Sequence, residues 1–450
     1  MSRYTSATDA DRQEMLDAIG VGSIDDLFVD VPEGVRLGRP LDLPPGKPEQ
    51  EVYTRLRDLA ARNVSAEDEL SFLGAGMYDH YVPALVDSII SRSEFLTPYT
   101  PYQPEISQGG LQVMFEYQTA ISELTGLPVS NASVYEGPSA VAAAAYLAKL
   151  QNKRTRFLIS GGVHPHARET LETQSAGWGT TVEEVPLAAG VTDRAALEAA
   201  MGDDVSAVIV QYPNFLGAVE DLEALAPVAK ATGALLIVSC DPLTLGVLRP
   251  PGDFGADVAV GEGQTLGNRL DYGGPSFGFF AASEAHLRRM PGRIAGETTD
   301  VDGRRGFVLT LQTREQHIRR EKATHNICTA QALNALAGMI YLSWLGRRGL
   351  VELGELMLQR TAYARTALAG IEGVELLHEQ PVVREFAVKL DAPVEAVIER
   401  CAARGVNPGF PLEGNGLLVA ITEQRSREDI DRLAQVLGSA IAAEREGVHA

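Results

Sequence analysis

The sequence has 450 residues, of which 45% are hydrophobic and 22% charged, the composition of an ordinary globular protein. Its 39 basic and 60 acidic residues give a formal net charge of −21, and a surface this acidic makes nucleic acid and anionic membranes poor partners. Because a single core stops growing at roughly 250–300 residues, we expect one large domain and a smaller one.

The N-terminus and the cysteines indicate a soluble, cytoplasmic protein. The first residues contain several acids and lack the apolar core of a signal sequence. The longest apolar stretches, 140–147 and 235–240, fall well short of the ~20 residues that a membrane span needs. Cys240, Cys328 and Cys401 have no paired spacing, so we expect reduced thiols rather than disulfides or a zinc site.

Residues 1–65 are expected to form an N-terminal arm. Short helices are predicted near 10–19 and from about 49 to 63. Between them, residues 32–48 are rich in proline and glycine and have little to bury, which favours an extended connector. Arms of this kind commonly embrace a partner subunit, and we expect that role here.

From residue 66 to 328 the pattern predicts a large α/β domain. Apolar runs alternate with amphipathic stretches, which indicates a mostly parallel sheet covered by helices on both faces. Ligands of such sheets bind beyond the carboxyl ends of the strands. The predicted strands are 157–160, 182–187, 205–212, 234–240, 257–261 and 278–281, and the predicted helices are 109–125, 164–175, 193–201 and 221–232.

Residues 329–450 are expected to form a small C-terminal α+β domain. A helix around 321–345 is predicted to bridge the two domains. The other predicted elements are a long helical region over 329–368, strands near 385–390 and 417–421, and a final helix over 427–442.

The ends of two consecutive strands draw attention to possible chemistry. Asp241 ends one apolar run, and the glycine-rich loop 262–269 follows the next strand. A carboxylate at such a strand end can pair with a pyridinium nitrogen, and this spacing is that of pyridoxal-phosphate enzymes of the aspartate aminotransferase fold type. The structural interpretation stays open beside it, because strand-end aspartates commonly cap helices and form turns.

The loop 262–269 lacks the amine that such an enzyme needs. In this fold type a lysine in that loop forms a Schiff base with the cofactor, a bond that only an amine can make. The chain has six lysines, and none lies between Lys230 and Lys322. A stand-alone pyridoxal enzyme of this fold therefore cannot be built from this chain.

Six segments carry a resemblance to one enzyme family. They are Ile19–Phe28, Phe72–Pro83, Tyr99–Gly109, Gly261–Gly267, Tyr272–Pro275 and Arg319–Thr329. Together they resemble the N-terminal subunit of the P-protein family, glycine dehydrogenase (decarboxylating) of the glycine cleavage system. The similarity covers essentially the whole chain, and the segment Tyr-Gln-Pro-Glu-Ile-Ser-Gln is highly specific.

The resemblance implies pyridoxal-phosphate fold type I, with a mostly parallel sheet of the seven-stranded type. The family has two homologous halves, on one long chain or on two, and the C-terminal half holds the cofactor on a lysine in a His-Lys-Thr sequence. Gln264 and Thr265 fall where His-Lys would be, so this half is expected to lack the lysine. Because no second half follows Ala450, we expect the two-chain form, assembled as a heterotetramer.

The implied reaction is the decarboxylation of glycine, with transfer of the aminomethyl group to the lipoyl arm of the H-protein. The homologous partner subunit holds the pyridoxal phosphate, so this chain is expected to have no catalytic residue, no metal and no activity alone. Two alternatives stay open. One is a cofactor-free regulatory or scaffolding paralogue, and the other is an independent aminotransferase or decarboxylase with a non-standard anchor.

Two segments hold the candidate active-site or interface residues. The glycine turn 74–80 offers Tyr78 and His80 where the backbone can approach a ligand closely. Prolines preset the backbone of loop 98–109, although the loop could also simply pack against the following helix. The candidates in this loop are Tyr99, Tyr102, Gln103, Glu105, Ser107 and Gln108.

Other positions are expected to be vestigial or structural. The turn 131–139 precedes an alanine-rich helix and resembles a phosphate cradle that is no longer used. Asp241, Gln264 and Thr265 are expected to be remnants of a cofactor site. His164 and His166 have no third ligand at a suitable spacing, so we expect a turn and a helix start there rather than a metal site.

Overall fold

The structure, a computed structural model, describes residues 6–323 and 330–448. Its contacts divide the chain into two compact units, with the boundary between Val64 and Ser65. None of the described helices is long and apolar enough to cross a membrane.

The N-terminal unit is a series of short helices that bury almost nothing. Its elements are α1 (Asp9–Ile19), η1 (Ile24–Phe28), η2 (Glu33–Val35) and α2 (Glu49–Ala60). The helix predicted over 49–63 therefore ends at Ala60. Thr8 begins α1 through a capping box, in which the side chains of Thr8 and Asp11 each accept the other residue's N–H. Among the described residues of this unit, only Leu16 is buried.

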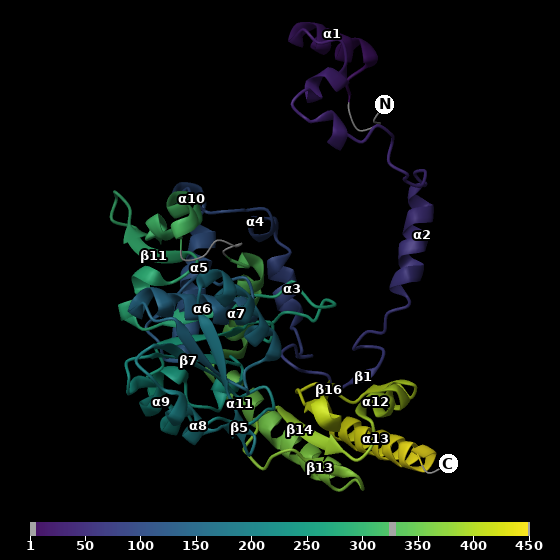
Figure 1. Ribbon diagram of the computed structural model, residues 1–450, viewed down its shortest axis with the longest axis vertical. Coiled ribbons are helices and arrows are strands. Elements are labelled where there is room, and N and C mark those ends of the chain that lie inside the picture. The colour runs from purple at the N-terminus through teal and green to yellow at the C-terminus, as the bar shows by residue number, and fades with distance from the viewer. Residues whose placement is uncertain (1–5, 324–329, 449–450) are drawn as a thin grey trace. The chain divides into compact units, whose positions relative to one another are not determined.

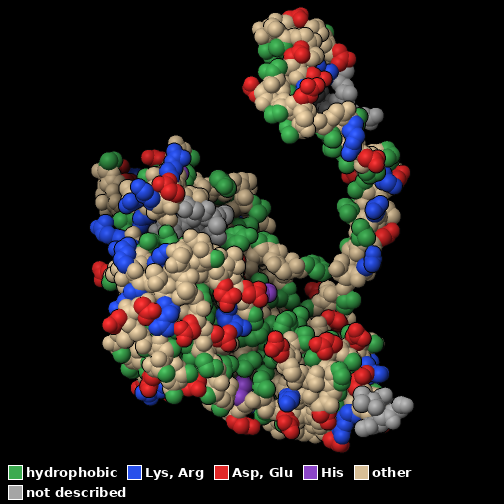
Figure 2. Space-filling model, in the orientation of Figure 1, with side chains coloured by type: hydrophobic (Ala, Val, Ile, Leu, Met, Phe, Trp, Pro, Cys, Tyr) green, Lys and Arg blue, Asp and Glu red, His purple; other side chains and the backbone are tan. Residues whose placement is uncertain are grey.

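Apolar side chains of the N-terminal unit are exposed along its surface (Figure 2). On α2, Val52, Leu56 and Leu59 are 41%, 59% and 46% exposed and recur at spacings of four and three, so they share one helix face. Phe28 and Leu43 are exposed as well. The unit thus presents apolar surface that its own residues do not cover.

The second unit is built on a sheet that has seven strands among the described residues, in the order β2-β10-β9-β8-β7-β3-β4. Figure 1 labels one of them, β7, below the helix α6 (Gly137–Asn152). The strands from β9 to β4 run parallel. At one edge β10 runs antiparallel to β9, and β2 pairs antiparallel with β10, so β2 has the direction of the parallel strands. The predicted mostly parallel sheet is confirmed. The strands are β2 (Val129–Ser130), β3 (Arg156–Ser160), β4 (Thr181–Val185), β7 (Val205–Tyr212), β8 (Leu235–Cys240), β9 (Val258–Glu262) and β10 (Gly278–Ala282).

Both faces of this sheet are apolar, because successive residues of its inner strands alternate between two core clusters. On β3, Leu158 lies in one cluster, while Phe157 and Ile159 lie in the other. Residues of α5, α9 and α11 join the first cluster, and residues of α6 and α7 join the second. These helices are α5 (Gln108–Thr125), α6 (Gly137–Asn152), α7 (Pro165–Trp178), α9 (Leu222–Lys230) and α11 (Ala332–Ala369).

Smaller elements complete this part of the chain. The antiparallel hairpin β11–β12 was not predicted from the sequence. The elements are α3 (Ala84–Ile90), α4 (Ser93–Leu96), β5 (Leu187–Ala188), β6 (Val191–Thr192), α8 (Arg194–Ala200), β11 (Ile294–Thr299), β12 (Arg305–Thr310) and α10 (Gln316–Arg319).

The C-terminal part has a sheet and a core of its own. Four strands among the described residues form an antiparallel sheet in the order β13-β14-β17-β16, and α12 and α13 pack with it around a third core cluster. Residues of α11 between 335 and 357 join the first core cluster instead, so the division into 1–65, 66–328 and 329–450 stays a proposal. The elements are β13 (Val374–Leu376), β14 (Glu385–Leu390), α12 (Val394–Ala402), β15 (Val406–Asn407), β16 (Phe410–Leu412), β17 (Gly416–Ala420) and α13 (Arg427–Val448).

Two segments connect the large and small parts of the second unit. The short strand β1 (Leu70–Ser71) pairs with β15, and Phe72 joins the C-terminal core, so the first residues assigned to the large domain pack with the small one. The helix α11 packs against α3 and α5 as well as α13. The bridging helix predicted over 321–345 begins too early, because α11 starts at Ala332. Residues 324–329, which include Cys328, lie outside the described part of the chain.

The turn that contains Gly217 should tolerate no side chain. Gly217 has a φ of +85°, and a Cβ there would lie 2.0 Å from the Glu385 carbonyl oxygen in β14. We expect Gly217→Ala to lower the free energy of unfolding by roughly 2–4 kcal/mol in chemical denaturation. Gly177→Ala is the control, since α7 has open space there and alanine should be neutral or favourable. Equal stability of the two variants would contradict this close approach.

Candidate functional site

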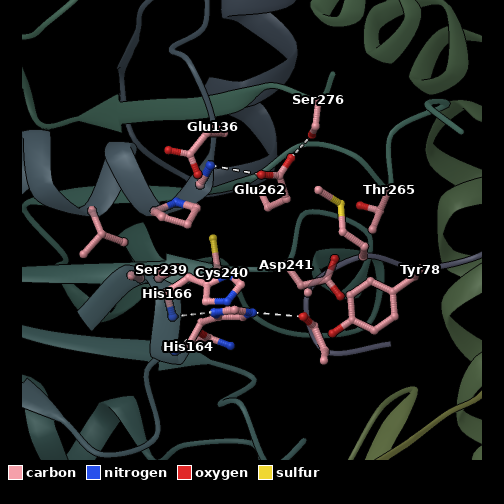
Figure 3. Close-up of a pocket in the computed structure, with 18 of the residues that line it drawn as sticks. Tyr78, Glu136, His164, His166, Ser239, Cys240, Asp241, Glu262, Thr265 and Ser276 are labelled. Carbon is pink, nitrogen blue, oxygen red and sulfur yellow. Dashed lines mark hydrogen bonds between the residues drawn. The ribbon is translucent and has the colours of Figure 1, made fainter. Parts of the chain in front are cut away.

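A cavity of about 470 Å³ lies beyond the carboxyl ends of β7, β8 and β9, where ligands of parallel sheets bind (Figure 3). Its wall combines the turn around Tyr78, the start of α6, the ends of these strands and the first residues of β14. Segments far apart in the sequence therefore meet in one cleft. Of the candidate residues, Tyr78, Asp241 and Thr265 line it.

Asp241 is committed to contacts within the chain. One of its carboxylate oxygens lies 2.5 Å from an Nη atom of Arg384, and the other accepts the N–H of Leu243 at 3.1 Å. The side chain of Arg384 is only 3% exposed. The carboxylate thus both forms the turn after β8 and pairs with a buried cation, as the structural interpretation of Asp241 requires.

Tyr78 and Glu385 form a second buried contact in the same wall. The Tyr78 hydroxyl donates to Glu385 at 2.7 Å, and the Ala75 N–H donates to the other oxygen at 2.8 Å. The Arg384 guanidinium lies 3.4 Å from the centre of the Tyr78 ring. Burial raises the pKa of Glu385 to about 7, and burial together with the Glu385 charge raises the pKa of Tyr78 well above its usual value.

His80 lies behind this wall and extends the network. Its Nδ1 is 2.6 Å from Glu423, and its Nε2 is 2.5 Å from an Nη atom of Arg384. A guanidinium can only donate, so Nε2 accepts and Nδ1 carries the proton that is donated to Glu423. His80 therefore joins a carboxylate to Arg384 and does not face the cavity directly.

The loop after β9 holds its two candidate residues in buried positions. Gln264 accepts the Tyr78 N–H at 2.9 Å and donates to the carbonyl oxygens of Tyr78 and Asn268. Thr265 is 2% exposed, and its hydroxyl has no hydrogen-bond partner. Among the described residues, no lysine lines the cavity.

Two carboxylates fill the N-terminus of α6, where the sequence suggests an unused phosphate cradle (Figure 3). The Gly137 N–H donates to Glu262 at 3.0 Å, and the Ser139 N–H donates to Glu136 at 2.8 Å. Burial raises the pKa of Glu262, against the opposing effect of its hydrogen-bond donors. Sequence reasoning missed Glu262, although an acid between two glycines at a strand end marks the position.

These residues do not fit pyridoxal phosphate. Among the described residues no lysine lines the cleft, the strand-end carboxylate Asp241 is paired with Arg384, and the start of α6 holds Glu262. A non-standard enzyme that binds this cofactor in this cleft is thereby disfavoured.

His164 and His166 lie at the start of α7, as predicted. His164 begins the helix by accepting the His166 N–H, and its Nε2 lies 2.9 Å from the Ala75 carbonyl oxygen. Burial lowers the pKa of His164. In the described part of the chain, no group of three or more His, Cys, Asp or Glu residues could hold a metal ion.

The loop 98–109 does not line this cavity. Gln108 anchors it by exchanging two hydrogen bonds with the backbone of Phe307 in β12, and Ser107 precedes α5. The Tyr102 hydroxyl lies 3.5 Å from Glu315. Outward from these anchors the loop is open to solvent: Tyr99 is 96% exposed, and Gln103 and Glu105 are exposed.

Comparisons with known proteins agree with one another. The sequence model described as glycine cleavage system P-protein matches residues 2–437. The probable glycine dehydrogenase (decarboxylating) subunit 1 of Geobacillus kaustophilus is 50% identical over 444 residues, which cover 97% of this chain and 99% of that protein. The protein of the same name from Carboxydothermus hydrogenoformans is 50% identical over 443 residues, with the same coverage.

Solved structures extend the comparison. Glycine decarboxylase (P-protein) of the glycine cleavage system, in inhibitor-bound form, has a TM-score of 0.88 and 44% identity, covering 98% of this chain and 100% of its own. A sphingosine-1-phosphate lyase of Burkholderia pseudomallei shares the fold at 16% identity, with a TM-score of 0.65 and coverage of 93% and 96%. The predicted fold type I class is confirmed.

Replacing Glu385 should change the dependence of stability on pH. With a pKa of about 7 against an ordinary 4.5, the folded chain keeps this proton over a range in which the unfolded chain has lost it. Glu385 therefore makes folding less favourable as pH rises through that range. Relative to wild type, Glu385→Gln should gain about 3 kcal/mol between pH 4 and pH 8. A stability difference that does not vary with pH would contradict this.

Proposed function

The chain belongs to the glycine cleavage system P-protein family, and we propose that it is the lysine-free subunit of a two-subunit glycine decarboxylase. With a homologous, lysine-bearing partner it decarboxylates glycine and passes the aminomethyl group to the lipoyl arm of the H-protein in the cytoplasm. One observation carries this proposal. No lysine of the described residues lines the cleft, in a chain that matches relatives named subunit 1 over nearly their full length.

Pyridoxal phosphate bound to the partner would accept the electron pair that is left on glycine when its bond to the departing carbon dioxide breaks. This chain's residues contribute position and shape. The contacts of Arg384 with Asp241 and His80 hold the walls of this chain's cleft in place. The exposed segments of the chain are therefore the ones that can contact the partner. We place the partner's cleft against loop 98–109 and the partner's surface against the N-terminal arm.

The exposed side chains of loop 98–109 support this arrangement. Tyr99 and Ile106 are 96% and 80% exposed, an unusual state for large apolar side chains in a loop that prolines hold rigid. The base of the loop is firmly held by Gln108 on β12. A rigid base with a polar and aromatic tip suits a loop that reaches into another subunit's site.

The N-terminal arm supports assembly in the same way. Its apolar residues, including Val52, Leu56 and Leu59 on one face of α2, are exposed within their own unit. Burying such a face gains roughly 25 cal/mol for each Å² of apolar surface removed from water. We propose that the partner subunit covers it.

Reconstitution tests the function. The chain and a homologous His-Lys-Thr partner should sediment together as a heterodimer or a dimer of heterodimers. Only the mixture, supplied with lipoylated H-protein, should release carbon dioxide from glycine. Separate sedimentation at micromolar concentration, or full activity of either chain alone, would refute the proposal.

Isosteric changes in the loop test its role. We expect Tyr102→Phe and Glu105→Gln to lower turnover by about ten- to a hundredfold, the cost of one hydrogen bond to a charged or reacting group. Glu172→Gln, a neutralisation of an exposed acid on α7, is the matched control and should leave activity unchanged. Sedimentation and cofactor absorbance of each complex show whether assembly is intact. Full activity in both loop variants would make the loop a structural interface only.

A further inference from the structure

Three hydrogen-bond donors from separate segments converge on the Glu262 carboxylate. The Gly137 N–H at the start of α6 donates to one oxygen at 3.0 Å. The Gln264 N–H at 3.0 Å and the Ser276 hydroxyl donate to the other. Main-chain N–H groups can only donate, so the site is built to receive an anion.

The rest of the first turn of α6 offers nothing to a second anion. Pro138 has no N–H, the Ser139 N–H donates to Glu136, and the Ala140 N–H donates to the Glu136 carbonyl oxygen. The fit around Glu262 is also close, since a Cβ on Gly137 would lie 3.0 Å from the Cβ of Glu262. A helix N-terminus of this length is otherwise a ready phosphate site.

We propose that Glu262 is a built-in anion that occupies the phosphate position of this cleft and makes the cleft reject phosphate esters, pyridoxal phosphate included. A phosphate that entered would meet Glu136 and Glu262 at the helix end and would have to displace a carboxylate that already satisfies three donors. The cofactor is thereby left to the partner's cleft. The rejection is electrostatic and steric, and it is separate from the absence of a lysine.

The same geometry makes the cleft a latent anion site. Removing the Glu262 side chain would free the N–H groups of Gly137 and Gln264 and the hydroxyl of Ser276. Thr265 lines the same cavity, and its buried hydroxyl has no hydrogen-bond partner. Glu262→Ala should therefore gain an affinity for inorganic phosphate that the wild type lacks.

The experiment titrates the full chain with inorganic phosphate against potassium chloride at matched ionic strength, and follows Tm. For Glu262→Ala, Tm should rise by about 1.5–2 °C for each tenfold increase in phosphate above the dissociation constant. Wild type should not respond. Glu262→Gln should not respond either, because the amide still fills the space. An equal response in wild type, or no response in folded Glu262→Ala, would overturn the proposal.

Two further measurements test the proposal even if Glu262→Ala does not fold. Equilibrium dialysis of wild type should detect no bound phosphate at millimolar concentration, and detectable binding in the cleft would overturn the proposal. Glu262→Gln places an amide NH₂ group among three hydrogen-bond donors, whereas the Glu136 side chain accepts from one backbone N–H, that of Ser139. Glu262→Gln should therefore lower Tm more than Glu136→Gln. An equal or smaller loss would overturn it too. Neither readout involves glycine or the partner, so the outcome is independent of the proposed function.

Discussion

The buried ion pair between Asp241 and Arg384 holds the cleft together. Burying two charges is costly unless close geometry and additional hydrogen bonds compensate. Here the pair is at 2.5 Å, His80 accepts from the same guanidinium, and the Tyr78 ring lies against it. These contacts join the end of β8, the turn 74–80 and the small sheet. Arg384 therefore both connects the two parts of the second unit and pairs with Asp241, which leaves the Asp241 carboxylate unavailable to a ligand of the cleft.

Sequence patterns predicted the fold well where local and tertiary preferences agree. The apolar strands of the parallel sheet were predicted within one or two residues of β3, β7, β8, β9 and β10, because residues buried on both faces leave little ambiguity. The β11–β12 hairpin was missed, although Asp302-Gly303 between two alternating stretches is a turn signal. Helix 321–345 was predicted too long, since composition alone did not indicate the extended backbone at Ala323.

The candidate site was predictable in location and less so in detail. The strand-end position of Asp241, the absence of a lysine in the following loop and the turn before α6 can all be found in the sequence. The partners Arg384 and Glu385, at the start of β14, and Glu423, shortly after β17, lie more than 140 residues beyond Asp241, and no local pattern brings them there. The same holds for Gln108, a loop candidate whose amide contacts are to β12 and to the loop itself.

The surroundings of Glu262 also affect how this chain could change over evolutionary time. A Cβ on Gly261 would lie 2.2 Å from the Cys240 carbonyl oxygen, and one on Gly263 would lie 2.3 Å from the Phe277 ring, so glycine is required on both sides. Regaining cofactor chemistry would need an amine at position 265, removal of the Glu262 carboxylate and release of Asp241 from Arg384. Each step alone gives no benefit and disturbs a buried contact. In the two-subunit enzyme that we propose, no single substitution in this chain would therefore give its cleft the groups that hold the cofactor.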